Sequence, residues 1–349
     1  MLEGGGQIVR TGVALATLTG QQVRISKIRD KRQNPGLQAQ HLTAVMALAA
    51  TCGAETEGLV LGSRELMFRP QRRVGGRFNF DVGTAGSIPL ILQALMPSAA
   101  FAPIQVEFEL TGGTDVKWSP TIDYVRLVVM PILEAMDYKA SLKVLRRGHY
   151  PKGGGRVVLT TSPLRTLKSI TLLERGQSSG VDGISHCVKL PSHVAQRQAN
   201  AALAKLKARG IASANIAIET YPPDQDPHVG PGSGITLVMT SSGGSVIGAD
   251  SLGERGRRAE QVGEDAALKL LAEIESKAPV DRHLGDILIP YMAVADGRSE
   301  IFVSEITMHT LTNIRIAEIV AGVKFDVQGN LREPGRVSVQ GIGLKPEST

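Results

Sequence analysis

The sequence predicts an α/β protein: three repeated βαβαββ units, each about 80 residues long, form a large domain, and a smaller α/β domain is inserted in the third. Strand patterns alternate with amphipathic helical patterns, which is typical of layered α/β folds. The turn "PKGGGRVVL" at Pro151 also echoes "LEGGGQIVR" at Leu2. A segment with two long amphipathic helical patterns, unlike the three units, divides the third unit. We therefore expect residues 1–180 and 279–349 to form the large domain and residues 181–278 the inserted one.

The first unit opens with the glycines Gly4 to Gly6 and a helical pattern that stops at Gly20, a residue type common at helix ends. An alternating pattern, "QQVRISKIR", predicts a strand. The next stretch, "PGLQAQHLTAVMALAATCG", predicts a second helix. The residues expected on its buried face are Leu37, Leu42, Val45, Met46, Ala49 and Cys52. Two strands joined by a basic loop, "LMFRPQRRVGGRFNFDVG", are expected to close the unit.

The second unit repeats this order. A helix is entered from Gly83 in "GTAGSIPLILQAL", and a strand follows in "IQVEFELTGG". The pattern "WSPTIDYVRLVVMPILEAM" predicts a helix with Ser119 as its N-cap and Pro120 at its first position. Two strands around a glycine-rich turn, "ASLKVLRRGHYPKGGGRVVLTTS", are expected to end the unit.

The third unit is split by the insert. Its first strand is predicted in "LKSITLLERG", and the rest in "HLGDILIPYMAVADG", "EIFVSEI", "TLTNIRIAEIVAG", "VKFDVQG" and "RVSVQGIG". The insert contains two long amphipathic helical patterns, "PSHVAQRQANAALAKLKARG" and "RGRRAEQVGEDAALKLLAEIESK". Strand patterns and the loop "YPPDQDPHVGPGSG" separate them.

Composition narrows the class of protein. The chain is 42% hydrophobic but only 4% aromatic, which predicts an aliphatic core. Cys52 and Cys187 have no metal-like spacing, so a reduced, cytoplasmic protein is the simplest interpretation. We find neither a signal peptide nor an apolar run of membrane-spanning length, and we expect no membrane partner. A net charge of +6 weakly favours a polyanionic partner.

Several motifs leave structural and functional interpretations open. Backbone N–H groups of the glycine loop could bind phosphate, with Arg10 one helical turn away, but a tight turn explains the glycines equally well. The loop is not a Walker A motif. Arg29, Lys31 and Arg32 suit phosphate contacts, yet a solvated basic loop is the simpler explanation. A second basic run fits either an RNA backbone or solvent; it consists of Arg69, Arg72, Arg73 and Arg77.

The seven histidines show no metal-ligand spacing, and neither a G-x-S-x-G nor an H-E-x-x-H motif occurs. His309 lies in "SEITMHTLTNIRIAE", next to an apolar helical pattern. A lone histidine in such a pattern is more often structural than catalytic, so the local sequence does not settle its role.

Seven motifs occur in an order and spacing that resemble the RNA 3′-terminal phosphate cyclase family. They are "EGGGQIVR", "PGLQAQHLTAV", "TAGS", "TGGTD", "YPKGGGRV", "HLGDILIP" and "MHTLTNI". The resemblance covers essentially the whole chain and implies the fold described above. It also implies one strand before the glycine loop, which a sequence starting at Met1 does not contain. A missing strand would threaten the position of Glu3 and leave the edge of the first unit unpaired.

The resemblance implies an ATP-dependent conversion of an RNA 3′-terminal phosphate into a 2′,3′-cyclic phosphodiester. A histidine attacks the α-phosphorus of ATP and releases pyrophosphate, and AMP then passes to the RNA 3′-phosphate. The neighbouring 2′-hydroxyl closes the ring and AMP leaves. Neutral imidazole is a good nucleophile near neutral pH, and adenylation supplies the leaving group that a phosphate lacks.

The roles implied by the resemblance fall on named positions. His309 in "MHTLTN" is the nucleophile, and Glu3 binds a divalent metal, Mg²⁺ or Mn²⁺. The residues implied to bind ATP are Arg10, Arg29, Arg32, Gln40, Gln93, Pro120, Tyr124, His283, Leu284, Gly285, Asp286 and Ile287. The family commonly has an aromatic residue at the position of His283. The implied partners are ATP and RNA 3′-phosphate ends, and a homo-oligomer is a possible assembly.

Two other functions compete with this hypothesis. The first is a non-catalytic relative that binds RNA in ribosome biogenesis, which would have no need of an adenylate-accepting histidine. The second is an enolpyruvyl-transferase-like enzyme, which shares a repeated βαβαββ design but acts on small anions. Only the cyclase is expected to become covalently labelled by α-labelled ATP.

Overall fold

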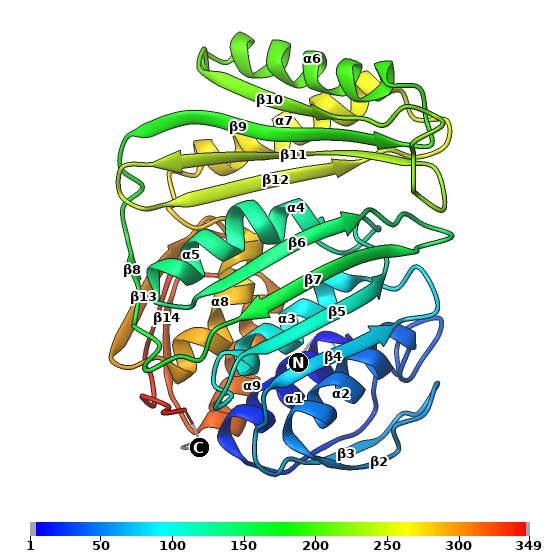
Figure 1. Cartoon of the computed structure of the whole chain (residues 1–349). Helices are drawn as coiled ribbons and strands as arrows, with labels where there is room; N and C mark the ends of the chain where they lie inside the picture. Colours follow the sequence, from blue (N-terminus) through cyan, green and yellow to red (C-terminus); the bar gives the residue numbers. More distant parts are fainter. Residues whose placement is uncertain (1–4, 347–349) are drawn as a thin grey trace.

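A computed structural model describes residues 5–346 of the chain (Figure 1). Its helices are α1 (Gln7–Thr19), α2 (Ala39–Cys52), α3 (Ile88–Ala99), α4 (Ile122–Tyr124), the π-helical η1 (Val125–Val129), α5 (Met130–Ala135), α6 (His193–Ala208), α7 (Ala259–Glu275), α8 (Arg282–Val294) and α9 (Met308–Ala321). Its strands are β1 (Val23–Ile25), β2 (Glu55–Glu57), β3 (Leu66–Arg69), β4 (Gly76–Asp81), β5 (Val106–Gly112), β6 (Ala140–Arg146), β7 (Gly155–Thr161), β8 (Thr171–Leu172), β9 (Ser178–Val188), β10 (Ala214–Glu219), β11 (Gly232–Ser241), β12 (Val246–Leu252), β13 (Arg298–Val303), β14 (Phe325–Gln328) and β15 (Gly335–Gln340). The predicted α/β class is confirmed.

Two of the four-stranded sheets have the same topology. One has the order β4-β5-β7-β6 and the other β8-β13-β15-β14. In both, the first pair of strands is parallel and the other two pairs are antiparallel. The sheet nearest the N-terminus, β1-β3-β2, is antiparallel throughout and has the order of the last three strands of the others. These three sheets, with α1–α5, α8 and α9, make up what we call the large body.

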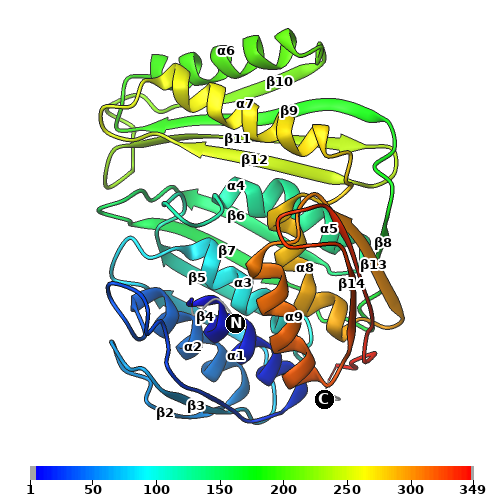
Figure 2. The same ribbon diagram turned by 180° about the vertical axis from the view of Figure 1, so that it is seen from behind.

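The fourth sheet, β10-β9-β11-β12, lies between β8 and α8 in the chain and stacks on the large body (Figures 1 and 2). Helices α6 and α7 pack against each other and against this inserted sheet. They bury a separate apolar core that includes Leu206, Leu237 and Leu270. Val238 and Val246 of the same sheet belong instead to the core of the large body. The inserted sheet therefore has one face covered by its own helices and contributes the other to a junction.

Polar contacts fix this junction. The backbone N–H of Thr121 donates to Asp250 Oδ2 at 3.0 Å, and the hydroxyls of Thr121 and Thr236 are 2.8 Å apart. Arg147, which is 2% exposed, donates to both carboxylate oxygens of Glu219 on β10 at 2.7 Å. Buried charges need such partners because removal from water is costly.

Three details of the sequence prediction are wrong. Strand β4 pairs in parallel with β5, so it opens the second sheet instead of closing the first unit; a strand pattern does not identify its neighbour. Thr121, not Ser119, caps α4, because its hydroxyl accepts the N–H of Tyr124. Met46 is 46% exposed, since α2 turns Ala44, Ala47 and Leu48 inward instead.

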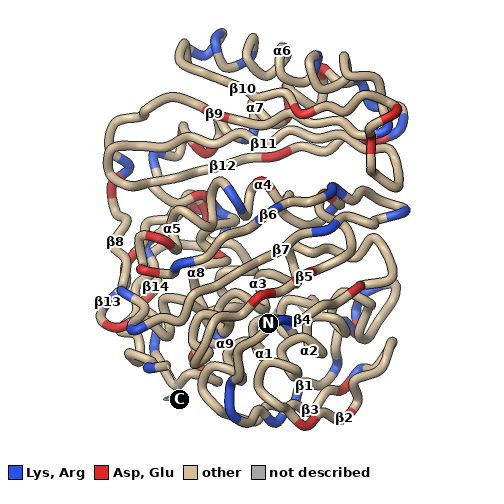
Figure 3. Tube along the Cα trace, viewed as in Figure 1, with Lys and Arg blue, Asp and Glu red and all other residues tan. Residues whose placement is uncertain are grey.

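Two residues of the predicted basic run, Arg69 and Arg73, make contacts within the protein. Arg73 is buried and donates to the carbonyls of Thr17, Leu18 and Phe101, which anchors the end of α1. Arg69 pairs with Glu57 at 2.6 Å. Lysines and arginines are spread over both the large body and the inserted sheet (Figure 3). Within residues 5–346, no helix combines the length and apolar character needed to cross a bilayer.

Candidate active site

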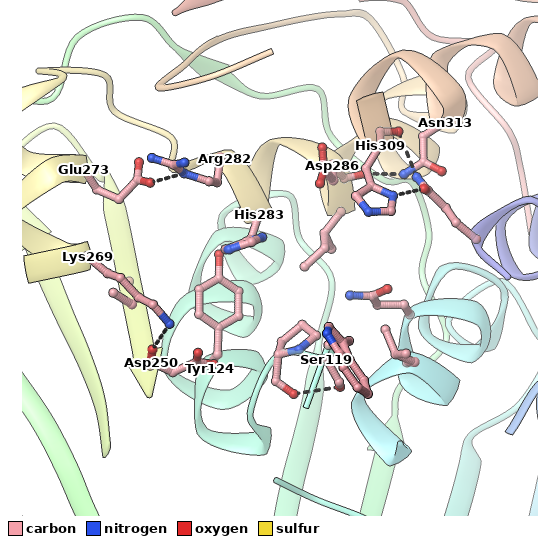
Figure 4. A pocket seen from close by; sticks show the side chains of 18 of the residues that line it. Ser119, Tyr124, Asp250, Lys269, Glu273, Arg282, His283, Asp286, His309 and Asn313 are labelled. Atoms are coloured by element: carbon pink, nitrogen blue, oxygen red, sulfur yellow. Dashed lines mark hydrogen bonds and ion pairs between the residues drawn. The ribbon is translucent and has the colours of Figure 1, made fainter. Parts of the chain in front are cut away.

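A cavity of about 860 Å³ lies between the large body and the inserted sheet (Figure 4). This volume falls within the usual range for small-molecule sites. Side chains from α1, α3, α4, α8 and α9 line it on one side, and β12 and α7 contribute the other wall. The lining residues are Gln7, Arg10, Thr11, Leu90, Gln93, Trp118, Ser119, Pro120, Tyr124, Gly248, Ala249, Asp250, Leu268, Lys269, Ala272, Glu273, Arg282, His283, Asp286, Ile287, Pro290, His309 and Asn313.

His309 is exposed to the cavity at the start of α9. Thr307 caps this helix: its hydroxyl accepts the backbone N–H of Thr310 at 3.0 Å. The start of a helix carries a partial positive charge and suits an anionic ligand. The imidazole of His309 therefore projects from a position that favours phosphate.

Gln7 contacts His309 at two points. Its Nε2 donates to the backbone carbonyl of His309 at 2.8 Å, and its Oε1 contacts Nδ1 of the ring. An amide oxygen can only accept, so this contact assigns the ring proton to Nδ1. In that tautomer the lone pair is on Nε2, which is the nitrogen able to act as a nucleophile.

Asp286 on α8 joins the start of α9. Its Oδ1 accepts the hydroxyls of Thr307 and Thr310, both at 2.6 Å, and its backbone carbonyl accepts Nδ2 of Asn313 at 2.8 Å. Burial raises the pKa of Asp286, while the two threonine hydroxyls act in the opposite direction. Asp286, His309 and Asn313 lie together on one side of the cavity (Figure 4).

Asp281 organises the middle of the cavity although it does not line it. It caps α8 by accepting the N–H groups of His283 and Leu284, both at 2.9 Å. It also accepts the Tyr124 hydroxyl at 2.7 Å and the N–H of Gly248 on β12 at 3.0 Å. Burial, reinforced by Asp281, raises the pKa of Tyr124 well above its usual value, so the phenol stays a neutral donor. Tyr124 meets His283 edge-on, with ring centroids 6.3 Å apart.

The opposite wall carries charged groups of β12 and α7. Arg282 on α8 pairs with Glu273 of α7 at 2.6 Å and with Glu305 at 2.7 Å. Lys269 donates to the backbone carbonyl of Asp250 at 2.8 Å. These contacts make α7 and β12 part of the cavity wall (Figure 4).

The glycine loop brings the predicted arginines near one another. The ring of His41 fills the space beside Gly6, where a Cβ would lie 1.9 Å from Nε2. Burial, followed by the charges of Arg10 and Arg29, lowers the pKa of His41 to about 3. Burial lowers the pKa of Arg10 to about 10, which leaves it cationic at neutral pH. A Cβ at Gly5 would lie 3.8 Å from Nη2 of Arg32.

The structure brings some of the residues predicted from the sequence to the cavity and leaves others outside its lining. The residues it brings to the cavity are His309, Arg10, Gln93, Pro120, Tyr124, His283, Asp286 and Ile287. Arg29, Arg32 and Gln40 lie outside the lining: Arg29 donates to the carbonyls of Asn34 and Gly36, and Gln40 accepts the N–H of Ser87. Leu284 and Gly285 are buried in α8, where Gly285 packs against β13. Glu3 lies outside the described residues.

Sequence reasoning missed several lining residues. Gln7 and Asn313 lie inside the motifs "EGGGQIVR" and "MHTLTNI", but nothing in the spacing of these motifs shows that α1 packs against α9. Asp250, Lys269 and Glu273 come from the insert, which gave no functional signal. Trp118, the only tryptophan in the chain, is 94% exposed at the cavity. Its exposure distinguishes it, because a tryptophan is usually buried on most of its surface.

A cavity with an exposed histidine at a helix start and arginines nearby suits an enzyme that acts on phosphorylated substrates. Comparison with known proteins gives the particular family. Residues 1–327 match the family model described as RNA 3′-terminal phosphate cyclase. The chain belongs to the RNA 3′-terminal phosphate cyclase family.

Relatives of similar length share about half of their residues with this chain. An RNA 3′-terminal phosphate cyclase of Ignicoccus hospitalis is 49% identical over 341 residues, covering 97% of this chain and 96% of its own. That of Hyperthermus butylicus is 50% identical over 352 residues, covering 99% and 98%. That of Desulfurococcus amylolyticus is 48% identical over 348 residues, covering 99% and 97%.

Solved structures give weaker similarity. The enolpyruvyl transferase NikO from Streptomyces tendae has a TM-score of 0.41 and 8% identity, and this chain spans 49% of its length. EPSP synthase from Acinetobacter baumannii has a TM-score of 0.30 and 10% identity, with 99% of this chain and 82% of that chain covered. Neither score supports a conclusion about function.

Proposed function

We propose that this protein uses ATP to convert an RNA 3′-terminal phosphate into a 2′,3′-cyclic phosphodiester, with His309 as the covalent nucleophile. The observation that carries the assignment to His309 is its contact with Gln7, which places the ring proton on Nδ1. Nε2 then attacks the α-phosphorus of ATP, a P–N bond forms, and pyrophosphate leaves. Membership of the cyclase family supports the overall reaction.

The second and third steps transfer the adenylate and close the ring. An oxygen of the RNA 3′-phosphate attacks the adenylated histidine, which breaks the P–N bond and forms a phosphoanhydride. The RNA 2′-hydroxyl then attacks the terminal phosphorus of the RNA and AMP leaves. These displacements require positioning and charge neutralisation more than covalent assistance.

Cavity residues divide between the two ends of ATP. We assign the adenosine to the side formed by Pro120, Tyr124 and His283, and the phosphates to Arg10 and the start of α9. Arg29 and Arg32 contribute positive potential near the glycine loop, and Gln40 accepts the N–H of Ser87 at the start of α3. Gln93 and Ile287 contribute to the lining. The buried positions of Leu284 and Gly285 favour a supporting role for these two residues.

Mg²⁺ or Mn²⁺ would neutralise the triphosphate. Both ions prefer oxygen ligands, which the carboxylates of Asp250, Glu273 and Asp286 could offer at this cavity. Our proposed ligand Glu3 lies outside the described residues.

The chain organisation is also proposed. We infer that the large body consists of three copies of one βαβαββ unit, supported by the shared order of its sheets. The separate core of the inserted sheet supports the domain limits 1–180, 181–278 and 279–349. Cys52 and Cys187 are both unbridged and buried, which fits a cytoplasmic protein.

The test is incubation with α-labelled ATP and a divalent metal. We expect the wild type to acquire a label that is labile in acid and stable in alkali, as a phosphoramidate is. His309→Ala should acquire none, yet it should still cyclise, at least in part, an RNA end adenylated beforehand. Labelling of the His309→Ala protein would show that the nucleophile is another residue. An unlabelled wild type that binds RNA would favour the non-catalytic alternative.

A further inference from the structure

Four buried side chains gather where the large body meets the inserted sheet, away from the lining of the nucleotide cavity. Asp115 follows β5 and His149 precedes β7, both in the large body. His186 lies on β9, and His228 lies between β10 and β11. All four are at most 6% exposed. The group therefore contains residues from both parts of the protein and lies at their junction.

Several polar atoms of this group have no hydrogen-bond partner in the part of the protein that the structure describes. Among residues 5–346, no hydrogen-bond partner exists for Oδ1 of Asp115, Nε2 of His149, either ring nitrogen of His186 or Nε2 of His228. An unsatisfied buried polar group destabilises the fold, because it has lost its hydrogen bonds to water without replacing them. Because native proteins rarely leave several such atoms in one place, the cluster is expected to face a bound species.

The geometry suits a metal ion. One ligand atom from each of Asp115, His149 and His186 lies within 4.8 Å of the other two. Tetrahedral zinc, with bonds of about 2.0–2.2 Å, needs its ligand atoms about 3.3 Å apart. A small movement of the three side chains would therefore bring these ligand atoms to the spacing found around zinc. Two imidazoles with one carboxylate form a ligand set typical of zinc and other divalent transition metals.

The surroundings hold the ligands in the required form. Thr114 Oγ1 donates to Oδ2 of Asp115 at 2.6 Å, and the same carboxylate oxygen lies 4.0 Å from Nε2 of His186. Nδ1 of His228 contacts Asp226 Oδ1 at 2.7 Å, so its Nε2 is the nitrogen left to coordinate.

The local charge also favours a cation. Arg147 contacts three buried or half-buried carboxylates, those of Asp115, Asp123 and Glu219. Arg126 also pairs with Asp123, so two guanidinium groups face three carboxylates, which leaves an excess of negative charge next to the histidines. A divalent cation would compensate it.

We propose that Asp115, His149 and His186 bind a divalent transition-metal ion, with Zn²⁺ as the best match and His228 as the fourth ligand. The ion ties β9 and the β10–β11 loop to the large body. Because β12 and α7 form one wall of the cavity, it also fixes the position of that wall. This site is separate from the metal that accompanies ATP.

Metal analysis of the full-length protein tests the proposal. After exhaustive dialysis against metal-free buffer, we expect about one zinc ion per chain. Stripping with dipicolinate should lower the melting temperature, and Zn²⁺ should restore it. Co²⁺ should give the visible absorption of a four-coordinate site with nitrogen and oxygen ligands. Zinc-free protein that binds no added Zn²⁺, with a melting temperature unaffected by chelation, would overturn the proposal and leave ordered water as the occupant.

Variants locate the ion. His149→Gln and His186→Gln should lose the zinc and the Co²⁺ spectrum, whereas His193→Gln, on the exposed start of α6, should keep both. Zinc lost in Glu3→Gln but kept in His186→Gln would place the ion at the nucleotide site and refute our assignment. If the two ligand variants do not fold, X-ray absorption of the wild type decides: a shell without imidazole scattering would refute the site.

Discussion

Gln7 and His309 are 302 residues apart in the chain, yet the amide of Gln7 contacts both the backbone carbonyl and the ring of His309. The side chain of Gln7 on α1 thus fixes the position of the first turn of α9 and the tautomer of His309. Thr11 and Asn313 form a further contact between α1 and α9, one helical turn along. The hydroxyl of Thr11 donates to the side-chain Oδ1 of Asn313 at 2.7 Å. The two helices hold the proposed nucleophile between them.

Replacing Gln7 by leucine should slow adenylation of His309 without moving the label. The change removes one donor and one acceptor while keeping the side-chain volume similar. Loss of about 1.5 kcal/mol of orienting interaction corresponds to roughly tenfold in rate. Single-turnover labelling at saturating ATP measures this directly. The control is Gln22→Leu, because Gln22 is exposed just before β1. An unchanged labelling rate in Gln7→Leu would show that Gln7 does not position the nucleophile.

Asp286→Ala should weaken the use of ATP more than the binding of RNA. The substitution leaves the hydroxyls of Thr307 and Thr310 without their shared acceptor at the start of α9. We expect a cost of about 1–3 kcal/mol, seen as a higher KM for ATP in labelling assays. Thr310→Val, which removes only one hydroxyl, should have a smaller effect. Equal losses for ATP and RNA would contradict a nucleotide-specific role.

Arg10→Ala should slow adenylation by about 10- to 150-fold, the range expected for one charged hydrogen bond of roughly 1.5–3 kcal/mol to phosphate. Arg29→Ala should slow it less, because Arg29 lies outside the cavity lining and binds the carbonyls of its own loop. The matched control is Arg77→Ala, whose side chain is 86% exposed. Thermal melting separates a loss of fold from a loss of rate. If Arg10→Ala labels as fast as the wild type, the phosphates lie elsewhere.

The buried His41 should make stability depend on pH. Its pKa is lowered to about 3 in the folded protein, whereas the unfolded chain has a pKa near 6.5. Its contribution is complete above pH 6.5 and is lost as the pH falls toward 3, because only the unfolded chain then binds the proton. Each pH unit costs about 1.4 kcal/mol within this window. Denaturant unfolding of wild type and His41→Asn should show a shallower acid loss in the variant; parallel curves would contradict the prediction.

Trp118 should stack on a base of the bound nucleotide or of the RNA end. It is almost fully exposed at the cavity. Its backbone φ is 60°, a value that residues other than glycine rarely adopt. Stacking of a base on an aromatic ring contributes about 1–3 kcal/mol. As the only tryptophan, it reports its own environment by fluorescence. We expect quenching on ligand addition and weaker binding in Trp118→Ala; fluorescence that neither ATP nor RNA alters would contradict stacking.

The sequence by itself determined the helix ends and amphipathic helices, because their signals lie in neighbouring residues. Gly20 and Gly53 end α1 and α2 in the left-handed conformation, as glycine after a helical pattern predicts. Apolar periodicity also identified α6 and α7, since an amphipathic helix shows its buried face in its own residues. The order of short motifs identified the family, and the resemblance predicted His309 as the nucleophile.

Tertiary structure decided which elements meet, because pairing depends on partners that are distant in the chain. A strand pattern could not assign β4 to β5, and no spacing could show that Gln7 reaches His309 or that Asp281 joins Tyr124, α8 and β12. The histidines behave in the same way: His149 and His186 show no ligand spacing, yet the junction of the inserted sheet with the large body brings them together with Asp115. Sequence fixes the chemistry that each side chain can perform, and packing of distant segments fixes which groups are close enough to use it.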